Sequence, residues 1–359
     1  MLIFKPCVFR CGSNYKIAVT SDNYSLAAVK AGDDIYTDNS CGIIRSACKT
    51  HIIEVPGEIL DREKKYTVIE REIIKRKAYC TETKPEKEYS FDFRPVPENP
   101  RCYHIADSHN DTGRAVAAAK VYGKIDFLIL NGDIIENSDT EENFYVIYKI
   151  ASEITGGEIP VIVTRGNHDL RGKLAELLAN YIPLMNGNPY YSGRLGSIWF
   201  LCLDCGEDKV DSHEEYGLTA DFHAFRRKET EYIKEIINNK ENEYDAPGIK
   251  HKIIISHIPF TFDYPAPFNI EKEIYSEWAS LIKENIKPGF MLCGHNHKAG
   301  IYSPGCAEDG MGQPCPLIVG TTKQNDYFMG AGIEFNGSGC EITFTDNEGK
   351  ICGREIINY

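Results

Sequence analysis

Aspartate, histidine and asparagine residues gather directly after five short apolar runs of this 359-residue chain. The runs cover residues 102–106, 126–130, 160–164, 252–256 and 289–293. They are followed by Asp107-Ser108-His109, Asn131-Gly132-Asp133, Arg165-Gly166-Asn167-His168-Asp169, His257 and Gly294-His295-Asn296-His297. Carboxylate oxygen and imidazole nitrogen are ligands for hard and borderline metal ions. One such motif is a weak signal, but five in one chain indicate a metal centre. The set is too large for a single tetrahedral ion and suits two ions about 3.5–4 Å apart, bridged by a shared carboxylate and a water.

The elements that must position these residues can be read from the alternation around them. From residue 101 onward, apolar strand-like runs alternate with helix-like stretches at 112–121, 141–154, 170–181, 221–239 and 271–284. This alternation predicts an α/β domain with a largely parallel sheet over residues 101–359. Ligands of such sheets bind beyond the carboxyl ends of the strands, where all five motifs fall. Three short runs near the end of the chain predict β-hairpins.

Residues 1–94 have a different rhythm. Short alternating segments are separated by Gly, Asp and Asn, which predicts antiparallel strands and an all-β sandwich of the immunoglobulin or fibronectin type III kind. Leu60 precedes Tyr66 by six residues, a spacing that fits either a tyrosine corner or an ordinary strand that starts with tyrosine. Three prolines follow within residues 95–100, and we expect a linker and the domain boundary there.

The motif series from Asp107-x-His109 to Gly294-His295-x-His297 resembles that of the calcineurin-like metallophosphoesterases, over roughly residues 101–345. The resemblance implies a four-layer sandwich, with two mixed sheets between helices and a dinuclear site at the strand ends. By position, Asp107, His109 and His297 would hold one ion. Asn167, His257 and His295 would hold the other, and Asp133 would bridge both. A metal-bridging hydroxide would then attack phosphorus in line, and His168 would protonate the leaving group.

A small β-sandwich ahead of this domain, together with the stretch from Leu203 to Lys209, resembles bacterial relatives of the purple acid phosphatases. The chain departs from purple enzymes at two points. Its first motif is Asp-x-His rather than Asp-x-Gly, and Glu136 stands where the purple enzymes have an iron-binding tyrosine. We therefore expect a non-purple centre with two divalent ions, either Mn, Zn or Fe(II). Glu136 is interpreted either as the residue that orients His168 or as a solvent-facing acid.

Three further residues are candidates for substrate binding. Asn110 either touches a phosphate oxygen or serves the start of the next helix. Arg165 either contacts phosphate or forms a structural ion pair. His213 lies in the loop after Cys205 and is a candidate for the wall of the substrate pocket.

Composition limits the partners. The net charge of −13 argues against general nucleic-acid binding, because Lys and Arg supply affinity for a phosphate backbone. No apolar run is long enough to span a bilayer, and Lys5, Pro6 and Arg10 interrupt the first residues, so we expect no membrane association and no signal peptide. The 13 scattered cysteines favour reduced thiols and a cytoplasmic location. Composition leaves the oligomeric state open.

The pattern favours a phosphomonoesterase that acts on a phosphorylated small molecule or another phosphoester. A phosphodiesterase, for example one for cyclic nucleotides, would use the same motifs. A binding module that retained the fold without activity is the alternative from another class, although such proteins usually lose one or more ligands.

Overall fold

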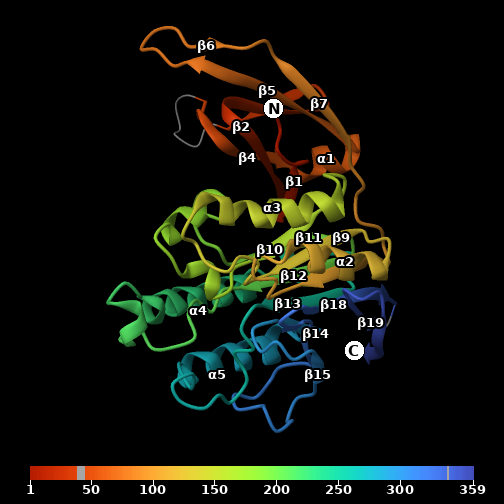
Figure 1. Cartoon of the computed structure of the whole chain (residues 1–359). Coiled ribbons are helices and arrows are strands. Elements are labelled where there is room, and N and C mark those ends of the chain that lie inside the picture. The colour runs from red at the N-terminus through yellow and green to blue at the C-terminus, as the bar shows by residue number, and fades with distance from the viewer. Residues whose placement is uncertain (39–44, 338) are drawn as a thin grey trace.

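The computed structural model describes residues 1–38, 45–337 and 339–359 (Figure 1). The helices are α1 (Gly57–Glu63), α2 (Thr112–Tyr122), α3 (Glu141–Thr155), α4 (Phe222–Asn238) and α5 (Lys272–Leu281), with a π-helical turn η5 (Ile282–Ile286) and short 3₁₀ helices η1 (His168–Leu170), η2 (Ala175–Asn180), η3 (Glu214–Tyr216) and η4 (Lys240–Asn242). The strands are β1 (Cys7–Cys11), β2 (Asn14–Ala31), β3 (Asp34–Thr37), β4 (Cys48–Pro56), β5 (Lys65–Lys75), β6 (Glu82–Thr83), β7 (Lys87–Asp92), β8 (Arg101–Ile105), β9 (Phe127–Asn131), β10 (Val161–Thr164), β11 (Tyr191–Leu195), β12 (Ile198–Leu203), β13 (His251–Ser256), β14 (Phe290–Cys293), β15 (Gly300–Tyr302), β16 (Leu317–Val319), β17 (Thr322–Gln324), β18 (Tyr327–Asn336), β19 (Gly339–Asp346) and β20 (Ile351–Asn358).

The strands form two mixed sheets, as expected. The first has the order β20-β19-β18-β8-β9-β10-β1-β2-β5-β6, and its central strands β8, β9 and β10 are parallel. The second has the order β11-β12-β13-β14-β16-β15, with β12, β13, β14 and β16 parallel. The predicted hairpins of the C-terminal segment are present as β18–β19 and β19–β20, and they extend the first sheet beside β8.

Three apolar cores explain how the layers stack. One core lies between the sheets and includes Ile129 of β9 and Ile253 of β13. A second joins the other face of the first sheet to α2 and α3, and a third joins the second sheet to α4 and α5. The parallel strands are buried on both faces, which is why their sequences are continuous apolar runs rather than alternating ones. The result is a helix–sheet–sheet–helix arrangement (Figure 1).

The N-terminal segment is rich in strands, as expected, and these strands are continuous with the rest of the fold. Strand β1 pairs in parallel with β10, and β2 continues the same sheet outward. Apolar residues of β2, β4 and β5 belong to the same core as Ile129 and Ile253. The sheet and its core therefore cross the boundary that the sequence predicted at residues 95–100.

The structure also shows how Tyr66 and the proline-rich stretch are held. The Tyr66 hydroxyl donates a hydrogen bond to the Gly157 carbonyl at 2.8 Å, so it reaches across to the α3–β10 connection instead of closing a tyrosine corner. Leu60 lies in the short helix α1. The proline-rich stretch is held in place, because the Arg94 amide bonds to the Glu158 carbonyl and the Ser197 hydroxyl bonds to the Glu98 carbonyl.

The helix expected over residues 170–181 is also incorrect. The chain there forms only η1 and η2, separated by Gly172, whose φ of 134° is incompatible with a helix. In the described ranges, the helices are too short or too polar to cross a bilayer, and the twelve cysteines there are free thiols.

Candidate metal centre

Each predicted motif lies just beyond the carboxyl end of a parallel strand. Strands β8, β9 and β10 of the first sheet carry the motifs of Asp107, Asp133 and Asn167. Strands β13 and β14 of the second sheet carry those of His257 and His295. The two sheets face each other across their shared core, so ligands from both meet at one edge of the sandwich.

The structure brings the predicted metal-binding residues together. Potential ligand atoms lie within 4.8 Å of one another in three overlapping groups, namely Asp107/His109/His297, His109/Asp133/His168 and Asp133/His257/His295. Asp133 belongs to two of them. Asn167 joins the cluster through its Oδ1, which lies 3.0 Å from His295 Nδ1.

Individual distances show how tightly the groups converge. The Nε2 atoms of His109 and His297 are 3.2 Å apart. Asp107 Oδ1 lies 3.3 Å from His297 Nε2, and Asp133 Oδ2 lies 3.2 Å from His257 Nε2. Asp107 and Asp133 are both almost fully buried. Buried carboxylates this close to imidazole nitrogens are arranged for a shared cation.

The backbone of the cluster adopts conformations that sequence motifs do not reveal. Asp107, His109, Asp133, His295 and His297 all have positive φ, between 45° and 68°. A left-handed backbone costs a residue with a side chain roughly 1–3 kcal/mol. Such strain collects at functional sites, where the surrounding structure holds it.

Glycines create the space that this convergence needs. A Cβ at Gly132, where φ is 76°, would lie 2.5 Å from the His257 ring and 2.7 Å from the Gly166 amide nitrogen. A Cβ at Gly294 would lie 2.6 Å from the Asp107 carboxylate. The glycines of three motifs therefore allow ligand-bearing loops to pack against one another.

Hydrogen bonds orient the ligand atoms. His257 Nδ1 donates to the Asn131 carbonyl at 2.8 Å, which leaves its buried Nε2 without a hydrogen-bond partner and facing the two carboxylates. A carbonyl partner of this kind fixes the tautomer of metal-binding histidines. The Asp107 carboxylate accepts the His295 amide, and Asp133 Oδ1 accepts the His168 amide at 2.9 Å.

The electrostatics also suit a cation. Burial alone would raise the pKa of Asp133, but His257 and the other neighbouring imidazoles hold it well below its usual range. Burial alone would lower the pKa of His257, but the carboxylates of Asp133 and Asp107 raise it to about 10. Positive charge is therefore favoured between these groups, and the donor set of carboxylates, imidazoles and an amide fits divalent ions.

His168 and Glu136 lie beside the cluster in an unexpected arrangement. His168 Nδ1 lies 3.0 Å from the backbone carbonyl of Glu136 and 3.8 Å from its carboxylate. The carboxylate is closer to His109, at 3.1 Å from Nδ1. The backbone of Glu136 therefore orients His168, while its side chain lies at ion-pair distance from His109.

The three substrate-binding candidates differ in their placement. Asn110 Oδ1 accepts the Glu136 amide at 3.2 Å, which ties the first motif to the second. Arg165 donates to Asp204 at 2.6 Å and so forms the structural ion pair that was one of its two interpretations. His213 is placed in its own loop, where Nδ1 accepts the Glu215 amide and the ring faces Tyr216.

Two functional neighbours were not assigned from the sequence. The buried Asp169 carboxylate accepts the amides of Gly166 and Asp133 at 2.6 and 3.0 Å and so joins two motifs. Arg171 Nη1 lies 3.4 Å from His168 Nε2, and the same guanidinium makes two 2.7 Å bonds to Glu207. Asp169 could have been suspected from its motif, but the Arg171–Glu207 pair joins distant segments and left no local signal.

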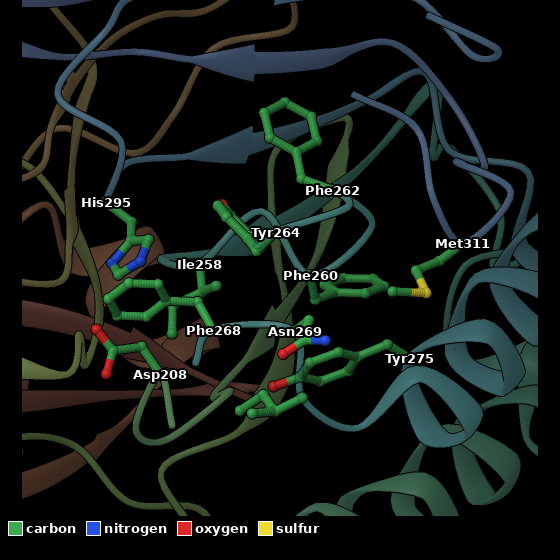
Figure 2. Close-up of a pocket in the computed structure, with 11 residues that line it drawn as sticks. Asp208, Ile258, Phe260, Phe262, Tyr264, Phe268, Asn269, Tyr275, His295 and Met311 are labelled. Atoms are coloured by element: carbon green, nitrogen blue, oxygen red, sulfur yellow. The ribbon is translucent and has the colours of Figure 1, made fainter. Parts of the chain in front are cut away.

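An aromatic pocket adjoins the cluster (Figure 2). His295 and Asp208 form its polar side, and Phe260, Tyr264 and Phe268 form much of the rest. The Tyr264 hydroxyl donates to Asn296 Oδ1 at 3.0 Å, which supports the turn between the two histidines of the last motif. The pocket gives the site an apolar wall next to a charged one.

Comparison with known proteins identifies the family of the chain. Residues 100–299 match the model of the calcineurin-like phosphoesterase family, and the chain belongs to that family. Purple acid phosphatase PPD1 from yellow lupin seeds shares the fold with a TM-score of 0.62 at 14% identity, over 99% of this chain and 74% of that one. Vacuolar Protein Sorting 29 from Cryptosporidium parvum has a TM-score of 0.37 at 11% identity, over 73% of this chain and 99% of that one. No curated protein matches the chain in sequence.

Proposed function

We propose that the chain is a dinuclear, metal-dependent phosphoesterase that hydrolyses phosphomonoesters. The observation that carries the proposal is the position of Asp133, whose carboxylate groups with His109 on one side and with His257 and His295 on the other. Asp107, His109 and His297 would hold one divalent ion, and Asn167, His257 and His295 the other. When bound, such ions polarise phosphoryl oxygens and acidify water enough to act at neutral pH.

The charge of the site supports an anionic substrate. Two divalent ions contribute +4 and the carboxylates of Asp107 and Asp133 contribute −2, so a positive site would stand within a chain of net charge −13. A phosphate dianion is attracted to such a centre, whereas a long nucleic acid would be repelled by the rest of the surface.

His168 would act as the general acid. A carbonyl can only accept a hydrogen bond, so the Glu136 carbonyl keeps a proton on Nδ1 and leaves Nε2 to deliver one to the leaving oxygen. The Arg171 guanidinium, anchored by Glu207, lies 3.4 Å from that nitrogen and must release it before Nε2 carries a proton, because a guanidinium can only donate. We expect Mn, Zn or Fe(II) because the ligand set contains no sulfur and no tyrosine.

A matrix of metals and substrates tests the proposal. The protein is assayed with Mn, Zn, Fe(II) and Co on a phosphomonoester and a phosphodiester, beside Asp133→Asn and a matched surface control, Asp326→Asn. Changing residues around metal ligands costs about 10–100-fold, so loss of a bridging ligand should cost at least about 100-fold. The control should retain activity, because Asp326 is exposed.

Each outcome is informative. Preference for the monoester with a loss confined to Asp133→Asn supports the proposal. Preference for the diester makes the chain a phosphodiesterase. Activity that survives in Asp133→Asn contradicts the bridging role, and inactivity with every metal favours a binding module.

A further inference from the structure

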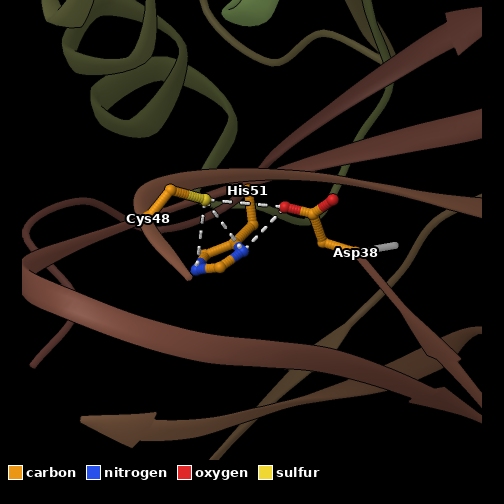
Figure 3. A group of neighbouring side chains, drawn as sticks. All are labelled: Asp38, Cys48 and His51. Carbon is orange, nitrogen blue, oxygen red and sulfur yellow. Dashed lines mark hydrogen bonds and ion pairs between the residues drawn. The ribbon is translucent and has the colours of Figure 1, made fainter. Parts of the chain in front are cut away.

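A second cluster of metal-ligand side chains lies far along the fold from the phosphoesterase motifs, on the N-terminal strands. Asp38 follows β3, and Cys48 and His51 lie on β4. Figure 3 shows their side chains converging. One carboxylate oxygen, one sulfur and one imidazole nitrogen lie within 4.8 Å of one another. The phosphoesterase motifs include no cysteine, so this cluster differs in chemistry from the first.

The spacing within the cluster suits a tetrahedral ion. His51 Nδ1 lies 2.9 Å from Asp38 Oδ2 and 3.4 Å from Cys48 Sγ, and the sulfur lies 3.6 Å from the carboxylate oxygen. Bond lengths to zinc of about 2.0–2.3 Å place tetrahedral ligands roughly 3.3–3.6 Å apart. Only the nitrogen–oxygen distance is shorter, as a direct hydrogen bond would make it, and it needs to open by less than about 0.5 Å to admit an ion.

Neighbouring side chains hold two of the three ligands, His51 and Asp38. The Ser25 hydroxyl lies 3.1 Å from His51 Nε2 and can accept its proton, which would leave Nδ1 as the ligand atom. Ser46 donates to Asp38 Oδ1 at 2.9 Å and leaves Oδ2 toward the cluster. Ser25 and His51 are fully buried, so the Ser25–His51–Asp38 alignment has no access for a substrate and is a support rather than a catalytic triad.

One side of the cluster opens to a cleft. Asp38 and Cys48 line it together with Glu141 of α3 and Tyr181, which belong to the phosphoesterase part of the chain. Three protein ligands are the number found in zinc sites that complete their coordination with a water or an exchangeable ligand. A thiolate and a carboxylate would neutralise a divalent ion, which lowers the cost of holding it in a largely buried place.

The alternative is a hydrogen-bonded polar cluster. Without an ion, burial and the neighbouring Asp38 carboxylate raise the pKa of Cys48 to about 12, so the sulfur would be a thiol that donates to the Thr50 carbonyl at 3.0 Å. A bound ion would instead stabilise the thiolate. The two cases therefore differ in the state of one sulfur atom, which can be observed directly.

We propose that Asp38, Cys48 and His51 bind one zinc-type divalent ion at a site separate from the phosphoesterase centre. The site joins β4 to the end of β3 beside the cleft that Glu141 of α3 also lines. It is independent of the proposed catalytic function, since it shares no ligand with it.

Titration with Co(II) under reducing conditions tests this site. Cobalt bound by a thiolate has a charge-transfer band in the near ultraviolet, which the sulfur-free phosphoesterase centre cannot produce. We expect the band to saturate at about one ion per chain. It should vanish in Cys48→Ser, remain in the exposed control Cys80→Ser, and remain in Asp133→Asn. Circular dichroism should show that Cys48→Ser is folded.

Zinc content gives a second readout. After equilibration with zinc and removal of free metal, Cys48→Ser and Asp38→Asn should each contain about one ion per chain less than the parent protein. Absence of the band in the parent protein, or a band that persists in Cys48→Ser, would overturn the proposal. Equal zinc content in all three proteins would also overturn it. Loss of activity in Asp133→Asn with an intact band separates failure of one site from failure of the other.

Discussion

The contacts of His168 allow the effect of its replacement on hydrolysis to be predicted. Its Nδ1 is held by a backbone carbonyl, so the ring is oriented independently of any one side chain. We expect His168→Ala to slow hydrolysis of an alkyl phosphate by about 10²–10⁴-fold, the usual contribution of a general acid. Hydrolysis of a nitrophenyl phosphate should fall by less than about tenfold, because that leaving group needs no proton. Equal losses on both substrates would contradict the role of general acid.

Glu136 is expected to act on metal binding rather than on proton transfer. Its carboxylate lies near His109, in the position of the acids that support metal-bound histidines. We expect Glu136→Gln to weaken metal binding by about 10–100-fold, measured as the metal concentration for half-maximal activity. At saturating metal its pH–rate profile should match the parent protein, with Glu142→Gln as control. A displaced profile would restore the direct role on His168.

Residue types and local spacing were enough to predict the metal-ligand candidates. Each motif directly follows an apolar run that predicts a strand. Parallel strands bring their carboxyl ends to one edge of the sheet. The same logic could not assign Arg165, because its partner Asp204 lies on another segment. The motif also could not indicate whether the side chain or the backbone carbonyl of Glu136 would contact His168, because both belong to the same residue.

At the scale of elements, the loops beyond the strands depend on close backbone packing. A Cβ at Gly166 would collide with the Asp133 carboxylate and lie 2.5 Å from its amide nitrogen. We expect Gly166→Ala to lower the free energy of unfolding by about 1–3 kcal/mol and to reduce metal content, because the β9 and β10 loops must separate.

Gly113 of α2 provides the matched control. A Cβ there has nothing within 4 Å. Gly113→Ala should raise stability by up to about 0.5–1 kcal/mol and leave metal content unchanged, as measured by urea unfolding and elemental analysis. Similar metal content in both variants would show that the loops tolerate separation.

For the whole molecule, the principal surprise is the contribution of the first strand. The run from Cys7 to Cys11 is short and follows no motif, so its pairing with β10 could not be predicted from local pattern. The sequence predicted strands in this segment but not that they share a sheet and a core with the part of the chain that matches the phosphoesterase family. Long-range pairing depends on contacts between distant residues, which periodicity does not encode.

This integration predicts that the chain unfolds as one unit. Phe9 of β1 is fully buried, and its ring lies 6.4 Å from that of Tyr148 on α3. We expect Phe9→Ala to lower the free energy of unfolding by about 3–5 kcal/mol, in line with other buried aromatic truncations. Because β1 completes the sheet beside β10, metal binding and far-ultraviolet circular dichroism should be lost together in urea. The exposed Tyr79 in the same N-terminal segment is the control, and Tyr79→Ala should change stability by less than about 0.5 kcal/mol. Two separate transitions, with the metal centre unaffected by Phe9→Ala, would instead establish an independent N-terminal domain.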